Sequence, residues 1–344
     1  MKISIIIPIH NGSKTIENCL RAIFNSKYKE YEVIVVDTNS SDNTVEIARK
    51  FPVRIIPLEM NPGAGAARNR GIKYADGTII LFIDSDVIID ENVLDLLVED
   101  FKANSAIDAV QVLYSQKCSF KNFTSIYSNL HYYYYGMKNK EGGFTTIGTF
   151  CVAIKKDVFV KAGGFDEDPS GRTTVAEDQK FGNKFTHMGF KIHLDKKITV
   201  EHRKYYSLVK YLLHDIQTGA QQIKCILRNR NKVISQAVKT GRLGVMIPVS
   251  FIAGSGLSFL IFITLPVLVF FRYLWINITL CAMIFLFYLL NFGFLFFCLK
   301  TKRWSFFVRA CLISYLRVLF GFFGALRGLL DYATNAPDKD LFRE

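Results

Sequence analysis

Apolar and polar positions follow one pattern in the first part of this chain and another in the last part. Up to about residue 115, short apolar runs alternate with longer amphipathic stretches. The short runs predict strands and the amphipathic stretches predict helices. The expected strands are 3–7, 31–37, 53–57, 78–84 and 146–154, and the expected helices are 13–24, 41–50, 65–74, 91–103 and 174–189. This alternation predicts an α/β fold, with a mostly parallel sheet covered by helices on both faces.

Polar side chains gather where these expected strands end. Asp37 closes the second strand, Asp84 and Asp86 close the fourth, and the turn Pro8–Asn11 follows the first. Open parallel sheets bind ligands beyond the carboxyl ends of their strands. The sequence therefore predicts a binding pocket at this edge.

The stretch LFIDSDVIID places two carboxylates directly after an apolar run. In an extended chain, residues i and i+2 point to the same face, so Asp84 and Asp86 should converge. Two like charges repel each other unless a cation lies near them. Carboxylate ligands suit Mg²⁺ or Mn²⁺, so a divalent metal ion is expected at Asp86.

The last part of the chain is basic and apolar together. Residues 1–201 hold 25 Lys/Arg and 25 Asp/Glu, whereas residues 202–344 hold 18 and 5, which accounts for the whole net charge of +13. A segment of this kind suits a membrane surface better than nucleic acid. The seven cysteines form no CxxC pair, so neither a zinc site nor a disulfide framework is indicated.

Two uncharged stretches, 243–271 and 273–299, flank Arg272, and each exceeds the roughly 20 apolar residues that span a bilayer. We expect a two-helix transmembrane hairpin; two buried helices of a soluble core are the alternative. Basic residues crowd both outer ends of the pair, which predicts cytoplasmic ends and a cytoplasmic catalytic domain.

The segment 304–330 is apolar but carries Arg309, Arg317 and Arg327. On a helix these three arginines fall within an arc of about 80°. One basic stripe predicts a helix lying in the membrane interface. A third membrane span is the alternative.

Six motifs occur in order: IIIPIHN, VVDTNSSDNT, NPGAGAARNRG, FIDSD, GGFDE and AEDQKFG. Over residues 2–202 this series resembles the inverting, GT-A-fold glycosyltransferases of family 2. The resemblance implies a GT-A catalytic domain at 1–202. Basic interfacial helices (203–242), the hairpin (243–299) and an amphipathic helix with a polar tail (300–344) would form an all-α membrane region.

The resemblance also implies roles for particular residues. Asp178, in the pair Glu177–Asp178, would be the catalytic base, and Asp86 would bind the metal ion. The expected substrate-binding residues are Pro8, His10, Asn11, Asp37, Asn39, Gly65, Arg68, Asp84, Ser85, Gly164 and Glu177.

Simpler explanations exist for several of these residues. Asp37 and Asn39 could cap the following helix together with Asp42, and the glycines around Gly65 could serve helix–sheet packing. Acidic residues in the first turn of a helix, such as Glu177 and Asp178, often only stabilise it.

The chain departs from the family pattern at two places. Thr38 stands where relatives often have a second acid, and KTKRW at 300–304 lacks the Gln of the QxxRW motif of processive synthases. The second departure argues against processive synthesis.

These observations predict a metal-dependent glycosyltransferase, anchored as a multi-pass protein of the cell (inner) membrane. It would move one sugar from a nucleotide-sugar donor to a lipid-linked glycan acceptor. The alternatives are transfer to polyisoprenyl phosphate, where no base is needed, and a non-catalytic membrane protein that binds nucleotide sugars.

Overall fold

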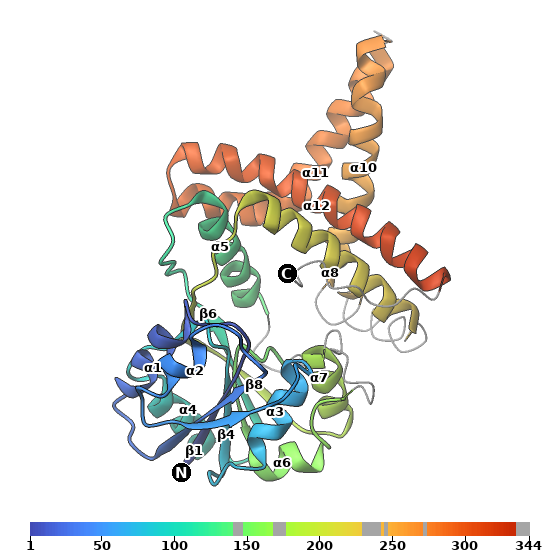
Figure 1. Ribbon diagram of the computed structural model, residues 1–344. Helices are drawn as coiled ribbons and strands as arrows, with labels where there is room; N and C mark the ends of the chain where they lie inside the picture. The colour runs from blue at the N-terminus through green and yellow to red at the C-terminus, as the bar shows by residue number, and fades with distance from the viewer. Residues whose placement is uncertain (140–146, 168–176, 229–241, 244–246, 271–273, 335–344) are drawn as a thin grey trace. The chain divides into compact units, whose positions relative to one another are not determined.

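The computed structural model describes residues 1–139, 147–167, 177–228, 242–243, 247–270 and 274–334 (Figure 1). The chain divides into two compact units. The first comprises Met1–Lys121 and Asn129–Tyr205 and is called the sheet unit below. The second comprises Asn122–Ser128 and Tyr206–Glu344 and is called the helical unit. Helix α5 (Phe123–Met137) contributes residues to both.

One eight-stranded sheet organises the sheet unit, in the order β3-β2-β1-β4-β7-β6-β8-β5. Its strands are β1 (Ile3–Ile9), β2 (Tyr31–Asp37), β3 (Arg54–Pro57), β4 (Ile79–Ile83), β5 (Val87–Ile88), β6 (Ala109–Tyr114), β7 (Cys151–Lys155) and β8 (Ile192–His202). The first four strands in this order are parallel, and β6 is parallel to β8. Strands β7 and β5 run antiparallel to their neighbours. The predicted, mostly parallel α/β architecture is confirmed.

Helices cover both faces of this sheet, as expected. One core joins it to α1 (Ile16–Phe24), α2 (Thr44–Ala48) and α4 (Val93–Ala103). The other core joins it to α3 (Ala64–Ile72), α6 (Lys156–Lys161) and α7 (Glu177–His187). Strand β1 is buried on both faces, which explains why its sequence is a nearly continuous run of isoleucines.

Strand β8 is a feature that the sequence pattern did not predict. Its buried positions Ile192 and Leu194 alternate, and so do Ile198 and Val200, but Asp195–Lys197 interrupts them. The pairing of β8 with β6 shifts register at this interruption. The buried residues keep a period of two from 192 to 200, but the charged Lys196 stands where an apolar residue would continue it, so the sequence shows two short fragments instead of one strand.

Within its described residues, the helical unit contains α8 (Leu208–Arg228), a short strand pair, and three further helices (Figure 1). The strands are β9 (Arg242–Leu243) and β10 (Ile247–Pro248), and the helices are α10 (Val249–Phe270), α11 (Leu274–Thr301) and α12 (Trp304–Ala333). Among the described residues of the uncharged stretch 243–271, Leu243 belongs to β9, Ile247 and Pro248 form β10, and Val249–Phe270 forms the helix. Arg272, between the two apolar stretches, lies outside the described residues.

Helices α8 and α12 approach each other through small residues. A Cβ atom at Gly324 would lie 2.2 Å from the carbonyl oxygen of Ile216, and one at Gly219 would lie 2.4 Å from that of Gly321. Only glycine allows two helix backbones to come this close. The contact fixes the register of the two helices.

Arg317 on α12 points toward α8. Its Nε and Nη2 donate to the two carboxylate oxygens of Asp215 on α8, at 2.9 and 2.8 Å. Its guanidinium lies 4.7 Å from the ring centroid of Tyr211. The stripe predicted for Arg309, Arg317 and Arg327 is therefore not a uniform surface facing lipid headgroups.

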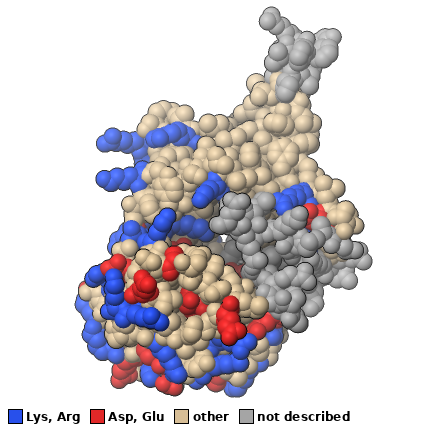
Figure 2. Space-filling view, in the orientation of Figure 1, with Lys and Arg blue, Asp and Glu red and all other residues tan. Residues whose placement is uncertain are grey.

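Two helices within the described residues, Asn277–Thr301 and Trp304–Ala333, are long and apolar enough to cross a membrane. On the face drawn in Figure 2, the helical unit is largely uncharged whereas the sheet unit intersperses basic and acidic side chains. The interfacial placement of 304–330 and the domain boundaries read from the sequence stay predictions.

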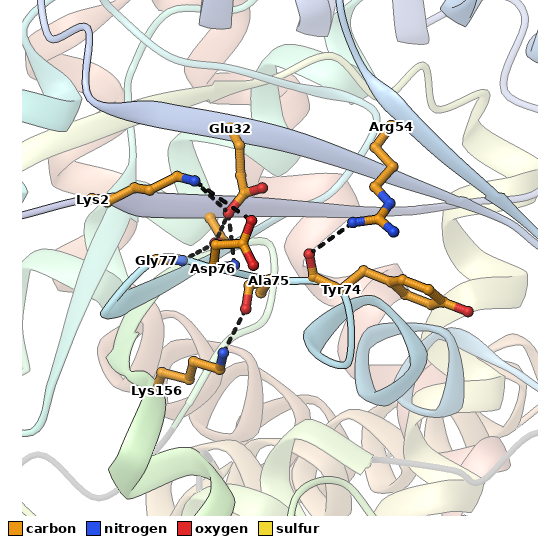
Figure 3. Close-up of polar contacts among 9 residues, drawn as sticks. Lys2, Glu32, Arg54, Tyr74, Ala75, Asp76, Gly77 and Lys156 are labelled. Carbon is orange, nitrogen blue, oxygen red and sulfur yellow. Dashed lines mark hydrogen bonds and ion pairs between the residues drawn. The ribbon is translucent and has the colours of Figure 1, made fainter.

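A polar cluster around Glu32 fixes the turn between α3 and β4, at the amino ends of β1 and β2 (Figure 3). Glu32 Oε1 accepts hydrogen bonds from Ser4 Oγ at 2.6 Å and from the Asp76 amide at 2.8 Å, and Lys2 Nζ lies 3.5 Å away. The Gly77 amide donates to Ser4 Oγ at 2.8 Å. Burial alone raises the pKa of Glu32, but these donors and the charge of Lys2 outweigh it and lower the pKa.

We predict that Glu32→Gln lowers the free energy of unfolding by about 1–2 kcal/mol at pH 7, because charge-assisted hydrogen bonds are lost. A depressed pKa stabilises the fold above the unfolded-state pKa of about 4.3, and this stabilisation is lost as the pH falls through the folded-state pKa. Thermal unfolding at pH 7 and near pH 3 should therefore show a difference that shrinks in acid. Glu30→Gln is the control, because Glu30 is 72% exposed. An undiminished difference in acid would contradict the prediction.

Candidate functional site

The turns after β1 and β2 are tied together at the carboxyl edge of the sheet. Asn11, in the left-handed conformation with φ 50°, donates its amide to Ser40 Oγ at 2.9 Å and accepts the Ser41 amide at 2.8 Å. His10 Nδ1 lies 2.9 Å from the carbonyl oxygen of Thr38. Pro8 lies within β1, opposite Val36. The turn predicted at Pro8–Asn11 begins only after Ile9, because β1 runs two residues further than expected.

Asp37 is buried where β2 ends, and its carboxylate accepts the Ser40 amide at 3.3 Å. Asn39 is exposed and has φ 62°. Neither caps the following helix: Asp42 Oδ1 accepts the amide of Thr44, the first residue of α2, at 3.1 Å. The N-cap of α2 is Asn43, whose side chain makes no capping hydrogen bond, so Asp42 binds the first helical amide from one residue before the N-cap and Asp37 binds none of the helix amides.

The segment Asp84–Asp86 is a turn rather than the end of a strand. Strand β4 stops at Ile83, and the Val87 amide donates to the carbonyl oxygen of Asp84 at 3.0 Å. The expected extended geometry is wrong here, because the chain has to leave β4 and enter β5, which pairs with β8. Ser85 Oγ lies near Gly12, 3.5 Å from where a Cβ atom would stand. The two carboxylates have separate partners, a guanidinium for Asp84 and an imidazole for Asp86.

Arg68 is the partner of Asp84, and it also reaches Glu177. Its Nη2 lies 2.7 Å from Asp84 Oδ1, and its Nη1 lies 3.5 Å from Glu177 Oε1. The arginine side chain is only 2% exposed. Gly65 allows the close approach, because a Cβ atom there would lie 3.0 Å from Glu177 Cγ. The residue expected to meet a phosphate thus joins two carboxylates.

The GGFDE loop is held to α3 by Asn69, which sequence reasoning missed. Asn69 Nδ2 donates to the carbonyl oxygen of Phe165 at 2.8 Å, and Asn69 Oδ1 accepts the Phe165 amide at 3.0 Å. Gly164 has φ 66°, and a Cβ atom there would lie 2.8 Å from Asn69 Oδ1. Gly164 therefore shapes the loop rather than offering a binding group.

Glu177 and Asp178 lie in the first turn of α7, as predicted. Burial and then the charge of Glu177 raise the pKa of Asp178 to about 6. A carboxyl group with such a pKa can accept and release a proton near neutral pH.

His202, at the end of β8, is the partner of Asp86. Its Nε2 lies 3.3 Å from Asp86 Oδ2. Burial raises the pKa of Asp86, but the hydrogen bond and charge of His202 outweigh this and lower it. The ring of His202 stacks on Tyr114 with centroids 4.8 Å apart, and Tyr114 stacks on Phe150 at 3.8 Å. Sequence reasoning did not include His202 among the site residues; recognising β8 as a strand would have brought it to this edge.

At the carboxyl edge of the sheet, Asp84 and Glu177 contact the Arg68 guanidinium, Asp86 contacts the His202 imidazole, and Asp178 lies beside Glu177. The family model described as "Glycosyl transferase family 2" matches residues 4–163. The chain carries a family 2 glycosyltransferase domain. The matched residues include strands β1 to β7, the Asp84–Asp86 turn and Arg68. Asp178 and His202 lie after the matched region in the sequence.

Curated relatives agree with this family 2 domain. A poly-beta-1,6-N-acetyl-D-glucosamine synthase of Staphylococcus epidermidis is 29% identical over 178 residues, covering 48% of this chain and 42% of the relative. The glycosyltransferase GlyG of Streptococcus pneumoniae serotype 4 is 34% identical over 126 residues, covering 35% of this chain and 42% of the relative. The alignment with the first of these relatives thus spans less than half of either protein.

The mannosyltransferase PcManGT from Pyrobaculum calidifontis, in complex with GDP-Man and Mn²⁺, is similar with a TM-score of 0.56 and 16% identity. The match covers 98% of this chain and 88% of that one. At this identity the likeness shows the fold alone, and it confirms the predicted GT-A fold.

We predict that Arg68→Met lowers the free energy of unfolding by about 2–4 kcal/mol, because it leaves two carboxylates without their buried cation. The figure lies below that for a fully buried pair, since Asp84 is 36% exposed. Arg70→Met is the matched control, because Arg70 lies on the same helix and is exposed. Denaturant unfolding of both variants measures the difference. Equal stability of the two would refute a structural role for Arg68.

Proposed function

We propose that this protein is a membrane-anchored, inverting, metal-dependent glycosyltransferase. It moves one sugar from a nucleotide-sugar donor to a lipid-linked glycan on the cytoplasmic face. The observation that carries the proposal is the meeting of Asp84, Asp86, Glu177 and Asp178 at one edge of a GT-A sheet. A pocket that only bound nucleotide sugars, the alternative of another class, would not need a carboxyl group with a raised pKa among them.

Asp86 and His202 are suited to hold the divalent ion. Two adjacent ligand atoms on one octahedral ion, at about 2.1 Å from it, stand about 3 Å apart. Asp86 Oδ2 and His202 Nε2 are 3.3 Å apart, which fits. The imidazole nitrogen favours Mn²⁺ over Mg²⁺, since Mg²⁺ prefers oxygen ligands. A bound ion supplies positive charge for the diphosphate leaving group.

Asp84 and Arg68 have a different part in this proposal. With one Asp84 oxygen held by Arg68, the carboxylate is oriented, and its 36% exposure leaves it accessible to a donor ribose. Asp37 and the Pro8–Asn11 turn would receive the base, ribose or phosphates at the ends of β1 and β2, with Asn39, Ser85 and Gly65 beside them. Arg68 binds a phosphate only if it exchanges one of its carboxylate partners.

Asp178 is proposed as the base that takes the acceptor proton as its oxygen attacks the anomeric carbon. A pKa of about 6 leaves the group mostly ionised at neutral pH and still basic enough to accept a proton. A lipid phosphate acceptor is already ionised and needs no base. Whether the reaction needs Asp178 as a base therefore distinguishes a lipid-linked glycan acceptor from the alternative acceptor, polyisoprenyl phosphate.

Single-sugar transfer and membrane anchoring complete the proposal. One relative is named a polysaccharide synthase, but KTKRW at 300–304 lacks the Gln of the processive motif, which favours single transfer. The helices Asn277–Thr301 and Trp304–Ala333 support an anchor, and the basic residues flanking the apolar stretches support cytoplasmic ends.

Release of nucleoside diphosphate by detergent-purified protein tests the proposed donor reaction. UDP-, GDP- and dTDP-sugars are offered with Mn²⁺ or Mg²⁺, with and without membrane lipid extract. We expect one donor to be turned over, faster with Mn²⁺ and with lipid. Asp86→Ala should abolish this release, whereas Asp90→Ala should keep it, because Asp90 is exposed and pairs only with Lys117 on the surface. Donor binding without release in any lipid would favour the non-catalytic alternative.

The pH profile of Asp178→Asn tests the proposed base. Because the carboxylate accepts a proton only when ionised, the wild-type rate should fall about tenfold per pH unit below pH 6. We expect Asp178→Asn to lower kcat by about 10²–10⁴-fold and to remove this inflection. Asp157→Asn, an exposed acid in the first turn of α6, is the control. A nearly unchanged kcat in Asp178→Asn would favour a lipid phosphate acceptor.

A further inference from the structure

A second group of ionisable side chains lies at the other end of β8, away from the site edge. His193 and Asp195 are two residues apart on this strand, and Asp100 comes from α4. One ligand atom from each lies within 4.8 Å of the others. Leu194, between the two strand residues, is fully buried, so His193 and Asp195 share the other face.

Asp100 occupies an unusual position for an acid. It follows the buried residues Val93 and Leu97 by seven and three positions, so it lies at the edge of the core-facing stripe of α4 and is partly buried. Its Oδ2 is enclosed and has no hydrogen-bond partner among the described residues. Burial and then the charge of Asp195 raise the pKa of Asp100 to about 6. A carboxylate that faces another one in this setting is stabilised by a cation between them.

The irregular stretch Asp195–Lys197 of β8 orients one of the three side chains, Asp195. The Lys197 amide donates to Asp195 Oδ1 at 2.6 Å, which orients the carboxylate where the register with β6 shifts. Irregularities of this kind often redirect a side chain toward a functional position. The irregular stretch thus contributes Asp195 to the group formed with Asp100 and His193.

We propose that Asp100, His193 and Asp195 bind a divalent transition-metal ion that joins α4 to β8. One imidazole and two carboxylates form a ligand set typical of Zn²⁺ and also suited to Mn²⁺, with water completing the coordination. Ligands about 2.1 Å from one ion stand at most about 4.2 Å apart, so small side-chain rotations close the site.

This site is separate from the candidate catalytic edge. Asp195 precedes His202 by seven residues on β8. Because Leu194 pairs with Gln111 and Val200 with Tyr114, the stretch up to His202 advances by about five residues of sheet, or roughly 15 Å. The proposal therefore does not rest on the proposed transferase activity. The competing account is a proton shared between Asp100 and Asp195 with no metal ion.

Metal binding to the full-length, chelator-treated protein in detergent distinguishes the two accounts. Zn²⁺ and Mn²⁺ are titrated separately, and both the bound ion per chain and the thermal unfolding midpoint are measured. We expect His193→Ala and Asp100→Asn each to lose one bound ion, or at least tenfold in affinity, together with the metal-induced rise in midpoint. Asp86→Ala should lose only the ion bound at the catalytic edge, so the ion and the part of the midpoint rise that depend on His193 should remain.

The matched control is His187→Ala, which changes an exposed histidine at the end of α7. It should bind like wild type. Asp195→Asn keeps the size of the side chain, and it is used for the same binding measurement if His193→Ala or Asp100→Asn fails to fold. The proposal is overturned if wild type, His193→Ala and Asp195→Asn bind the same amount of each ion with the same shift in midpoint. In that case, a midpoint of metal-free Asp100→Asn above that of wild type would indicate the shared proton.

Discussion

The site edge depends on one buried guanidinium. Without Arg68, the carboxylates of Asp84 and Glu177 would face each other in a poorly solvated position, and their repulsion would open the edge. Arg68 lies 2.7 Å from the first and 3.5 Å from the second. It thereby joins the turn after β4 to the start of α7, two segments more than 90 residues apart in the chain. Gly65, one turn earlier on α3, is what lets α7 come near enough.

Once these segments are fixed, two nearby carboxyl groups acquire opposite properties. His202 lowers the pKa of Asp86, whereas burial and Glu177 raise that of Asp178 to about 6. The first group therefore stays ionised across the physiological range, as a metal ligand must, and the second exchanges a proton near neutrality. Two chemical roles follow from one residue type, because the partners come from different strands and helices.

Sequence patterns identified the parts of this arrangement that depend on local structure. The strands ending at Asp37 and at Ile83 follow from apolar runs, and the position of the site follows from a rule about parallel sheets. The pairing of Asp86 with His202 was not predictable in this way, because it depends on β5 pairing with β8 across more than 100 residues. Strand β8 itself was not predicted, because the charged residues Asp195–Lys197 separate its apolar positions. For the same reason the turn at Asp84 was taken for an extended strand, since only the partner of β5 shows where the chain bends.

In the helical unit, too, the sequence pattern did not predict a charged pair between distant segments, Arg317 and Asp215. Read alone, α12 shows Arg317 as one of three arginines on a stripe, but the structure pairs it with Asp215 through two hydrogen bonds. An arginine on an apolar helix is costly in a lipid environment unless a partner satisfies it. The close backbone contact at Gly324 and Gly219 holds α8 where Asp215 can do so. The basic helix α8 and the apolar helix α12 therefore have to be treated as one element: wherever α12 inserts, α8 goes with it, and it carries the start of the basic segment 203–242 to the same place.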